Sequence, residues 1–326
     1  MLRVGIIGWS ENTERLISAF HFGNKNTELL AFSSNNEAAR RYVMDKYGLK
    51  HVFQYPERLL EFHQLDIVCI TSEGEKHLDQ VKSAMSNGFN VLLDYPMASN
   101  VEDCQNIQSI IENHPSLKAM IAFPRRFNSE LEQIKKFIDS KELGDLIQIR
   151  ISNFKSKENV VAPLKSHFKG PASDLGIEDI DLIHWLTESV CKNVVSLDST
   201  LKFSNNRDHH ETVNCIGHLE NGTMFNIMNS RSSFRGEGFE MDVLGSKASL
   251  KYNDITERIS IHPKNDSVRF YKIDTKESEY QLLANYFVDC VKYGNRLNQN
   301  LEDPINATKT VVAISKSQVL GQWIEV

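Results

Sequence analysis

The feature that most constrains the fold is a regular alternation of short apolar runs with amphipathic segments over residues 1–122. The apolar runs predict strands buried on both faces, because they lack the polar alternation of a half-exposed strand. They lie at 4–7, 29–32, 66–71, 90–94 and 118–123. Segments 13–22 and 36–47 between them place apolar residues at helical spacing. The pattern predicts a doubly wound parallel sheet, whose ligands bind beyond the carboxyl ends of its strands.

Local signals predict where several of these helices begin. Asn35 is a candidate N-cap for the helix at 36–47. The segments Ser72–Glu75 and Ser99–Glu102 both have the S-x-x-E form of a capping box, in which the serine accepts from a backbone N–H of the first turn. We therefore expect two further helices to start there.

After residue 123 the rhythm changes. Helical patterns at 128–141 and 174–188 flank a long strand at 146–155, and several strand-like runs separated by turn signals follow up to residue 273. Helical patterns at 278–293 and 303–320 close the chain. We predict an α+β second domain with a large, mostly antiparallel open sheet. The domains would be 1–122, binding a dinucleotide, and 123–326, binding substrate and mediating oligomerisation.

One strand of that sheet does not reveal which face it buries. Near residue 215, Val213, Cys215 and Gly217 alternate with a second set, Asn214, Ile216 and His218, and neither set is clearly apolar. The sequence pattern therefore does not decide whether the open face is hydrophobic.

Composition excludes several classes of protein. The net charge of -6 argues against nucleic acid or an anionic membrane as the main partner, and there is no run of eighteen apolar residues to span a membrane. The N-terminus enters a strand by residue 3, which is not the pattern of a signal peptide. The 5 cysteines are widely spaced, which predicts reduced thiols in a cytoplasmic protein and no zinc site.

The turn after the first strand resembles a degraded phosphate-binding loop. A dinucleotide fingerprint has the form G-x-G-x-x-G, whose glycines permit a tight turn and close backbone approach to a diphosphate. Here only the first glycine is present, and the segment is Gly8, Trp9, Ser10, Glu11, Asn12 and Thr13. Ser10 can still donate from its backbone and its hydroxyl, whereas Glu11 would have to point away from a diphosphate. An ordinary strand-to-helix turn is the competing interpretation.

The end of the second strand bears on the choice of cofactor. An acid there accepts the ribose hydroxyls of NAD, but this chain has Ser33, Ser34 and Asn35 instead. Hydroxyl groups suit a 2′-phosphate, so NADP is preferred over NAD. We expect Arg40 and Arg41, a turn or more into the next helix, to be too far away to take part. A simple turn and helix cap is the alternative.

Motifs along nearly the whole chain resemble the glucose-fructose oxidoreductase / inositol dehydrogenase / rhizopine catabolism (Gfo/Idh/MocA) family. Val4–Gly8 resembles the first strand and turn, Asp66–Thr71 with His77 resembles a later strand and cofactor loop, and Asp94-Tyr95-Pro96 stands where the family usually has Glu-Lys-Pro. Ala122–Phe127 resembles the link between domains. Gly170–Asp181 resembles G-G-x-x-x-D-x-G-x-H-x-x-D.

The resemblance implies a Rossmann domain followed by an α+β domain, and assigns site residues by position. The lysine, aspartate and histidine around the reacting carbon become Tyr95, Asp174 and Glu178, so only the aspartate is retained. Asp174 and Glu178 would share one helix face, where a purely structural role is the alternative. The remaining cofactor contacts implied are Thr71, Ser72, His77, Asp94, Tyr95 and Arg126, in addition to the loop residues and serines named above.

The resulting hypothesis is an NAD(P)-dependent oxidoreductase that transfers a hydride between nicotinamide and a small polar, sugar-type substrate. Tyrosine can donate the accompanying proton, although its ordinary pKa of about 10 makes it a poor base. We expect Arg126, His167, Asp174, Glu178 and Arg235 near the substrate, and a homodimer or homotetramer. A non-catalytic nucleotide or ligand sensor is the first alternative, and a reductase resembling biliverdin reductases, which show Glu-Tyr-Pro at the same place, is the second.

Overall fold

The computed structural model describes residues 1–326 except 11, 157–171, 200–211, 234–235 and 276. The chain forms two compact units. The first comprises Met1–Phe127 and Lys276–Ile305, and the second comprises Asn128–Thr275 and Asn306–Val326. This division differs from the contiguous segments 1–122 and 123–326 expected from the sequence, because a C-terminal segment returns to the first unit.

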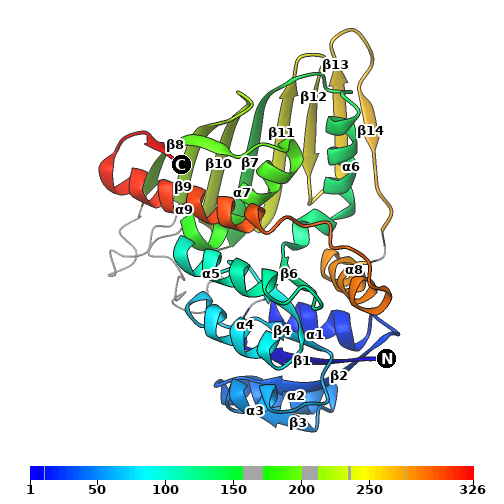
Figure 1. Ribbon diagram of the computed structural model, residues 1–326. Coiled ribbons are helices and arrows are strands. Elements are labelled where there is room, and N and C mark those ends of the chain that lie inside the picture. Colours follow the sequence, from blue (N-terminus) through cyan, green and yellow to red (C-terminus); the bar gives the residue numbers. More distant parts are fainter. Residues whose placement is uncertain (11, 157–171, 200–211, 234–235, 276) are drawn as a thin grey trace. The chain divides into compact units, whose positions relative to one another are not determined.

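The first unit is built on a six-stranded sheet with strand order β3-β2-β1-β4-β5-β6, in which every pair is parallel. It confirms the doubly wound Rossmann arrangement (Figure 1). Its strands are β1 (Leu2–Ile7), β2 (Thr27–Ser33), β3 (His51–Phe53), β4 (Ile67–Ile70), β5 (Asn90–Asp94) and β6 (Ala119–Ala122). The sequence did not predict β3 or the helix α3 (Pro56–Leu60), because elements of three and five residues carry too little periodicity.

Helices cover both faces of this sheet. One buried cluster joins β1 and β2 to helices α1 (Thr13–His21), α2 (Glu37–Tyr47) and α8 (Glu279–Tyr293). A second cluster, on the other face, joins β4 and β5 to α3, α4 (His77–Ser86) and α5 (Val101–Glu112). The hydrophobic effect thus fixes both layers around the sheet.

The helix starts correct three sequence predictions. Asn36, not Asn35, caps α2 by accepting from Ala39 N, and Asn100, not Ser99, caps α5 by accepting from Asp103 N. No capping box forms at Ser72, whose hydroxyl donates to Gln80 instead, and a 3-10 turn (Gly74–Lys76) precedes α4. A neighbouring asparagine supplies an equally good acceptor, so the serine pattern alone does not fix the register.

The returning segment 276–305 is an integral part of the first unit. Helix α8 lies beside α1 (Figure 1), and its Leu283 and Phe287 are fully buried in the first cluster. Gln299 accepts from Ile121 N and donates to Ile121 O, both at 2.8 Å, as a neighbouring strand would. Its side chain therefore satisfies an exposed edge of β6.

The second unit contains a nine-stranded sheet with order β14-β13-β12-β11-β7-β10-β9-β8-β15. All pairs are antiparallel except β7 with β10, so the sheet is mixed but mostly antiparallel, as predicted. Helices α6 (Ser129–Asp139), α7 (Ala172–Thr187) and α9 (Glu302–Leu320) are drawn over one face in Figure 1. The strands are β7 (Leu146–Ser156), β8 (Cys191–Ser199), β9 (Thr212–Leu219), β10 (Met224–Ser233), β11 (Gly238–Gly245), β12 (Ala248–Asn253), β13 (Arg258–Pro263), β14 (Arg269–Tyr271) and β15 (Ile324–Glu325).

The structure decides which way the ambiguous strand faces. In β9, Val213 and Cys215 are buried, whereas Asn214 and Ile216 are exposed. Ile216, Met224 and Leu244 are each 40% or more exposed, and each is paired across the sheet with a polar residue, Asn226, His218 and Gln148 respectively. The open face is therefore mixed in character, and homo-oligomerisation stays a prediction.

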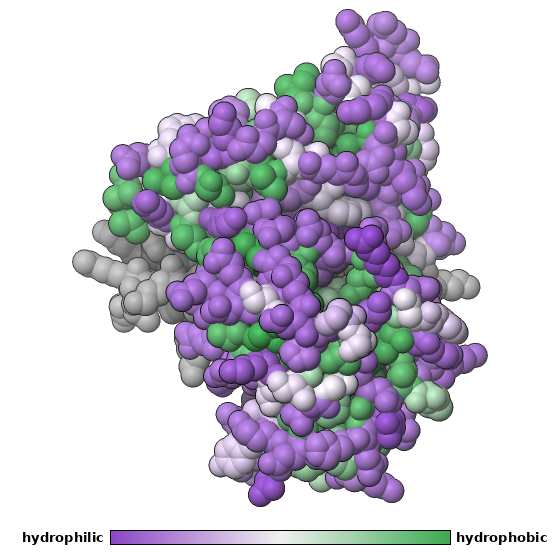
Figure 2. All heavy atoms as spheres, viewed as in Figure 1, coloured by the Kyte–Doolittle hydropathy of each residue, from purple (hydrophilic) through white to green (hydrophobic). Residues whose placement is uncertain are grey.

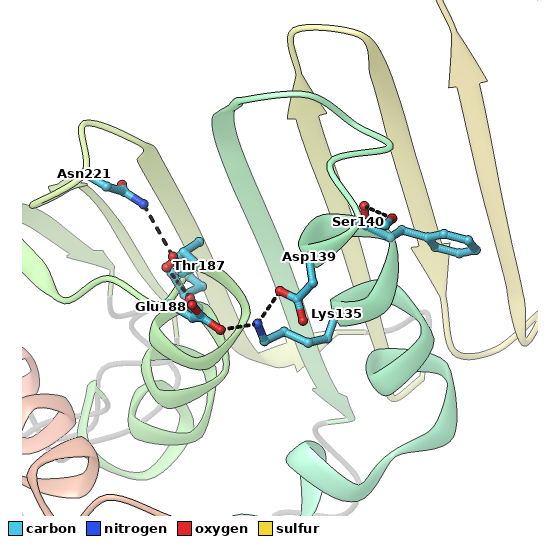
Figure 3. A network of polar contacts seen from close by, with 8 residues as sticks. Lys135, Asp139, Ser140, Thr187, Glu188 and Asn221 are labelled. Carbon is cyan, nitrogen blue, oxygen red and sulfur yellow. Dashed lines mark hydrogen bonds and ion pairs between the residues drawn. The ribbon is translucent and has the colours of Figure 1, made fainter.

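A polar network joins α6 to the end of α7 in this unit. Lys135 donates to Glu188 at 2.8 Å and also pairs with Asp139 one turn further along α6 (Figure 3). Thr187 donates to Ile183 O at 2.7 Å and closes the last turn of α7. Because Glu188 is largely exposed, the ion pair contributes little to stability.

The surface drawn in Figure 2 is mainly hydrophilic, with smaller hydrophobic patches, as expected where helices turn their polar sides outward. Within the described residues, no helix is both long and apolar enough to cross a membrane. All five cysteines are free and buried, as the prediction of reduced thiols requires.

Candidate cofactor site at the strand ends of the first unit

Gly8 makes the turn from β1 into the loop that precedes α1. Its φ of +104° lies in the left-handed region, and its N–H donates to Ser33 O at 2.8 Å. A Cβ at this position would lie 2.3 Å from Ser72 N and 2.5 Å from the Thr71 carbonyl carbon. Glycine is therefore required here because the turn after β1 touches the backbone that leaves β4.

Hydroxyl groups stand where the two later glycines of a dinucleotide fingerprint would be. Thr13 is fully buried, and its Oγ1 lies 2.8 Å from Thr71 Oγ1 and accepts from Ser10 N at 2.7 Å. Ser10 Oγ accepts from Asn12 N at 3.2 Å. The start of α1 is thus joined to the end of β4 by hydrogen bonds, where a glycine would allow close packing. The sequence pattern around Gly8 did not indicate this role of Thr13.

Asp94, at the end of β5, carries the buried charge of the site. Its carboxylate accepts from Asn12 Nδ2 at 3.2 Å, from Tyr95 N at 3.0 Å and from Ser10 Oγ at 3.4 Å. Only 4% of the residue is exposed, so these donors offset part of its desolvation. Asp94, Ser10 and Asn12 are therefore brought together, although β4 lies between β1 and β5 in the sheet.

Aromatic stacking fixes the side chain of Tyr95. Its ring lies on Phe123, with centroids 5.7 Å apart and planes at 19°, and the guanidinium of Arg126 lies 5.7 Å from the same Phe123 ring. Arg126 also forms a 3.0 Å ion pair with Asp303 of the returning segment. The ring of Phe123 thus contacts both Tyr95 and Arg126. A Tyr95→Phe substitution would keep the stack, because it keeps the aromatic ring.

His77 joins the loop after β4 to the turn after β5. The buried ring places Nε2 2.9 Å from Ser72 O, and Nδ1 3.1 Å from Pro96 O. Thr71 is buried, and its hydroxyl donates to Ile7 O at 3.1 Å. His77 and Thr71 therefore support the backbone of the site.

At the end of β2 the structure corrects the sequence prediction about Arg40. The guanidinium folds back along α2 and donates to Ser34 O at 2.6 Å, so it does reach the strand end. Ser33 is fully buried and its hydroxyl has no hydrogen-bond partner among the described residues, whereas Ser34 Oγ accepts from Asn36 N at 3.1 Å. A cation therefore lies where NAD-specific domains have an acid.

Trp9 anchors the loop after β1 in the hydrophobic core. Its indole contacts Phe32 and Tyr42 edge-on, with centroids 6.1 and 5.9 Å apart. It is partly buried against the first hydrophobic cluster. These contacts hold the loop after β1 against β2 and α2.

The structure describes only some of the remaining candidate residues. Glu178 lies in α7 of the second unit and is partly buried. Asp174 belongs to the same helix, but its side chain lies outside the described part, as do Glu11, His167 and Arg235. The common helix face of Asp174 and Glu178 stays a prediction.

Cysteine chemistry does not fit this site. Cys69 is buried in β4, and burial, together with the nearby Asp94 carboxylate, raises the pKa of its thiol well above the ordinary value. A thiol held in its neutral form is a poor nucleophile. Among the described residues, no group of three or more His, Cys, Asp or Glu side chains could hold a metal ion.

These residues fit a dinucleotide at two points. The left-handed Gly8 turn and the N-terminus of α1 form the usual start of a diphosphate site. The β2 end offers the Arg40 guanidinium to a ribose phosphate. The fit is less complete at Ser10 and Asn12, whose N–H groups already bond to hydroxyl oxygens.

Family models match both parts of the chain. Residues 2–122 match the model described as an oxidoreductase family with an NAD-binding Rossmann fold, and residues 131–251 match the GFO/IDH/MocA C-terminal domain. The chain belongs to the Gfo/Idh/MocA family. The family suggested by the sequence motifs is thereby confirmed.

Relatives within the Gfo/Idh/MocA family include named dehydrogenases. The chain is 26% identical over 200 residues to an inositol 2-dehydrogenase/D-chiro-inositol 3-dehydrogenase of Halalkalibacterium halodurans, covering 59% of this chain and 55% of that protein. The aligned part therefore spans about half of that relative. It is 25% identical over 268 residues to a glucose-6-phosphate 3-dehydrogenase of Bacillus subtilis, covering 78% and 75%.

A solved Gfo/Idh/MocA structure is similar over the full chain. The scyllo-inositol dehydrogenase of Lactobacillus casei, crystallised with bound NAD(H) and scyllo-inositol, has a TM-score of 0.86 at 20% identity and covers 100% of this chain and 99% of that one. At this identity the likeness concerns the fold.

Proposed function

We propose that the chain is a nicotinamide-dinucleotide-dependent oxidoreductase that acts on a small polyhydroxylated, sugar-type substrate. The observation that carries the proposal is the group at the strand ends of the first unit, where the Gly8 turn meets Asp94 and Tyr95. Family membership supports the same class, and the names of the relatives, which are inositol and glucose-6-phosphate dehydrogenases, support a polyol or sugar.

The finer part of the proposal is a preference for NADP over NAD. Arg40 supports it, because its guanidinium at the end of β2 would attract a 2′-phosphate, while no acid is present there to accept ribose hydroxyls. Ser34 lies beside it. Gly8, Trp9, Ser10 and Asn12 would form the loop against the diphosphate, with Thr71, Ser72 and His77 supporting it from the end of β4.

Replacing Arg40 with glutamine tests the cofactor preference. We expect NADPH to bind about 10- to 100-fold more weakly, because charge-assisted hydrogen bonds contribute roughly 1.5–3 kcal/mol, and NADH binding to change little. Fluorescence titration with both nucleotides measures this. Arg41→Gln is the matched control, since Arg41 is exposed and pairs with Glu37. A similar loss of NADPH and NADH affinity in the Arg40 variant would contradict the preference.

Bound nicotinamide would supply the hydride chemistry, and the residues of the chain would handle the proton. We assign the role of proton donor to the hydroxyl of Tyr95. Tyr95 follows β5, and its ring stacks on Phe123, which follows β6. Asp174 and Glu178 of α7 are proposed to bind substrate hydroxyls or to assist the proton transfer, since a carboxylate accepts such bonds. Arg126 would assist on the cofactor side.

A Tyr95→Phe variant should separate chemistry from folding. We expect turnover to fall by about 100- to 10,000-fold, the usual contribution of a positioned proton donor, while NADPH affinity and thermal stability stay near wild type because the stack on Phe123 is kept. Turnover is measured on a panel of inositols, sugars, sugar phosphates and biliverdin. Full turnover by the variant would remove Tyr95 from the mechanism.

A non-catalytic sensor is the second candidate. It is favoured by the engaged N–H groups of Ser10 and Asn12 and by the replacement of the family's lysine and histidine by Tyr95 and Glu178. Micromolar NADPH binding without turnover on the whole panel would favour it. Turnover of any panel member that depends on Tyr95 would exclude it.

A further inference from the structure

With two of three motif glycines absent, other contacts must hold the loop between Gly8 and Thr13 in shape. One of them comes from the far end of the chain. Tyr280, in the first turn of α8, is only 4% exposed, and its hydroxyl donates to Asn12 Oδ1 at 2.6 Å. Ser278 caps the same helix end by accepting from Gln281 N, so the tyrosine projects from a fixed turn.

The contacts of Asn12 with Tyr280 and with Asp94 together determine how its side-chain amide is oriented. With Oδ1 toward Tyr280, the amide nitrogen lies 3.2 and 3.4 Å from the two carboxylate oxygens of Asp94. The reversed amide would place its carbonyl oxygen against that carboxylate, which is a contact between two acceptors. Tyr280 must therefore act as the donor, and Asn12 transmits its position to Asp94.

Asp94 in turn holds the residue to which we assign the proton. Its Oδ1 atom accepts both from Asn12 Nδ2 and from Tyr95 N, at 3.2 and 3.0 Å. A continuous chain of hydrogen bonds thus runs from α8 through the loop to the end of β5. All of these residues belong to the first unit, and α8 lies beside α1 in Figure 1.

We propose that Tyr280 is a positioning residue, which holds Asn12, and through it Asp94 and Tyr95, in the geometry that receives a dinucleotide. Helix α8 thereby acts together with the hydroxyls of Ser10 and Thr13 in setting the conformation of the loop. The expected effect on cofactor affinity rests on the proposed function. The positioning of Asn12 by Tyr280 is a property of the protein without ligand.

The test compares two tyrosines of the same helix in the full-length protein. Tyr280→Phe removes the bond to Asn12, whereas the control Tyr286→Phe removes a bond from Asn298 N that lies away from the loop. Hydrogen–deuterium exchange is followed in peptides covering residues 8–16, and NADPH affinity by fluorescence titration. We expect exchange there to accelerate by about tenfold and NADPH to bind about tenfold more weakly in Tyr280→Phe only, the loss expected when one buried hydrogen bond is broken.

A double variant shows whether the tyrosine acts through Asn12. If it does, Tyr280→Phe combined with Asn12→Ala should weaken NADPH binding no more than Asn12→Ala alone. Additive effects, equal effects of the two tyrosine variants, or unchanged exchange at residues 8–16 in Tyr280→Phe would each overturn the positioning role. If the wild type binds no dinucleotide, the proposed function fails, while the exchange comparison still decides the role of Tyr280.

Discussion

Replacing Phe287 with alanine is expected to lower the free energy of unfolding by about 3–5 kcal/mol, the usual cost of deleting a fully buried phenylalanine. Phe287 has no exposed surface and lies in the first hydrophobic cluster with Phe20 and Ile6, although it is far from both in sequence. The cavity would open where α8 packs on the rest of the first cluster. Chemical denaturation followed by circular dichroism measures the loss.

The control for this prediction is Phe22→Ala. Phe22 follows α1 and is 68% exposed, so its truncation should change stability by no more than about 0.5 kcal/mol. A small effect at both positions would mean that residues 276–305 are not part of the cooperative core of the first unit. The expected contrast would instead establish that this unit depends on a segment far beyond residue 122.

Replacing Gly8 with alanine is expected to have the second large effect, on both stability and cofactor binding. The new Cβ would meet backbone atoms of Ser72 and Thr71 at 2.3–2.5 Å, and the left-handed φ would add strain. Strain and overpacking together predict a loss of about 2–5 kcal/mol. Because the turn after β1 would have to move away from the end of β4, we also expect NADPH affinity to fall by more than about tenfold, corresponding to 1.4 kcal/mol.

A Gly48→Ala control separates the strain of the left-handed φ from the collision of the new Cβ with the backbone of Thr71 and Ser72. Gly48 caps α2 with φ +67°, and a Cβ there would meet nothing within 4 Å. It should therefore show the conformational cost alone, about 1–2 kcal/mol, with unchanged NADPH binding. Thermal denaturation and fluorescence titration of both variants provide the comparison. An equal loss in the two variants would show that collision with the Ser72 backbone contributes nothing.

The sequence by itself determined the order and type of the long elements, because their periodicity is a local property of consecutive residues. The parallel strands β1, β2, β4, β5 and β6, helices such as α1 and α6, and the mostly antiparallel second sheet all follow from such patterns. Family motifs located Asp94 and Tyr95 at a strand end, and the structure has them there. Helix caps were less well determined, since Asn36 and Asn100 compete with adjacent residues for the same donors.

Tertiary structure alone decided which distant residues meet. Nothing near Asn12 indicates that its partner is Tyr280, and the pattern around Arg40 does not reveal that its side chain folds back to Ser34. The assignment of residues 276–305 to the first unit and the outward direction of Ile216 also depend on packing between remote segments. Such contacts depend on the shape of the whole buried surface, so a local sequence window does not contain the information that fixes them.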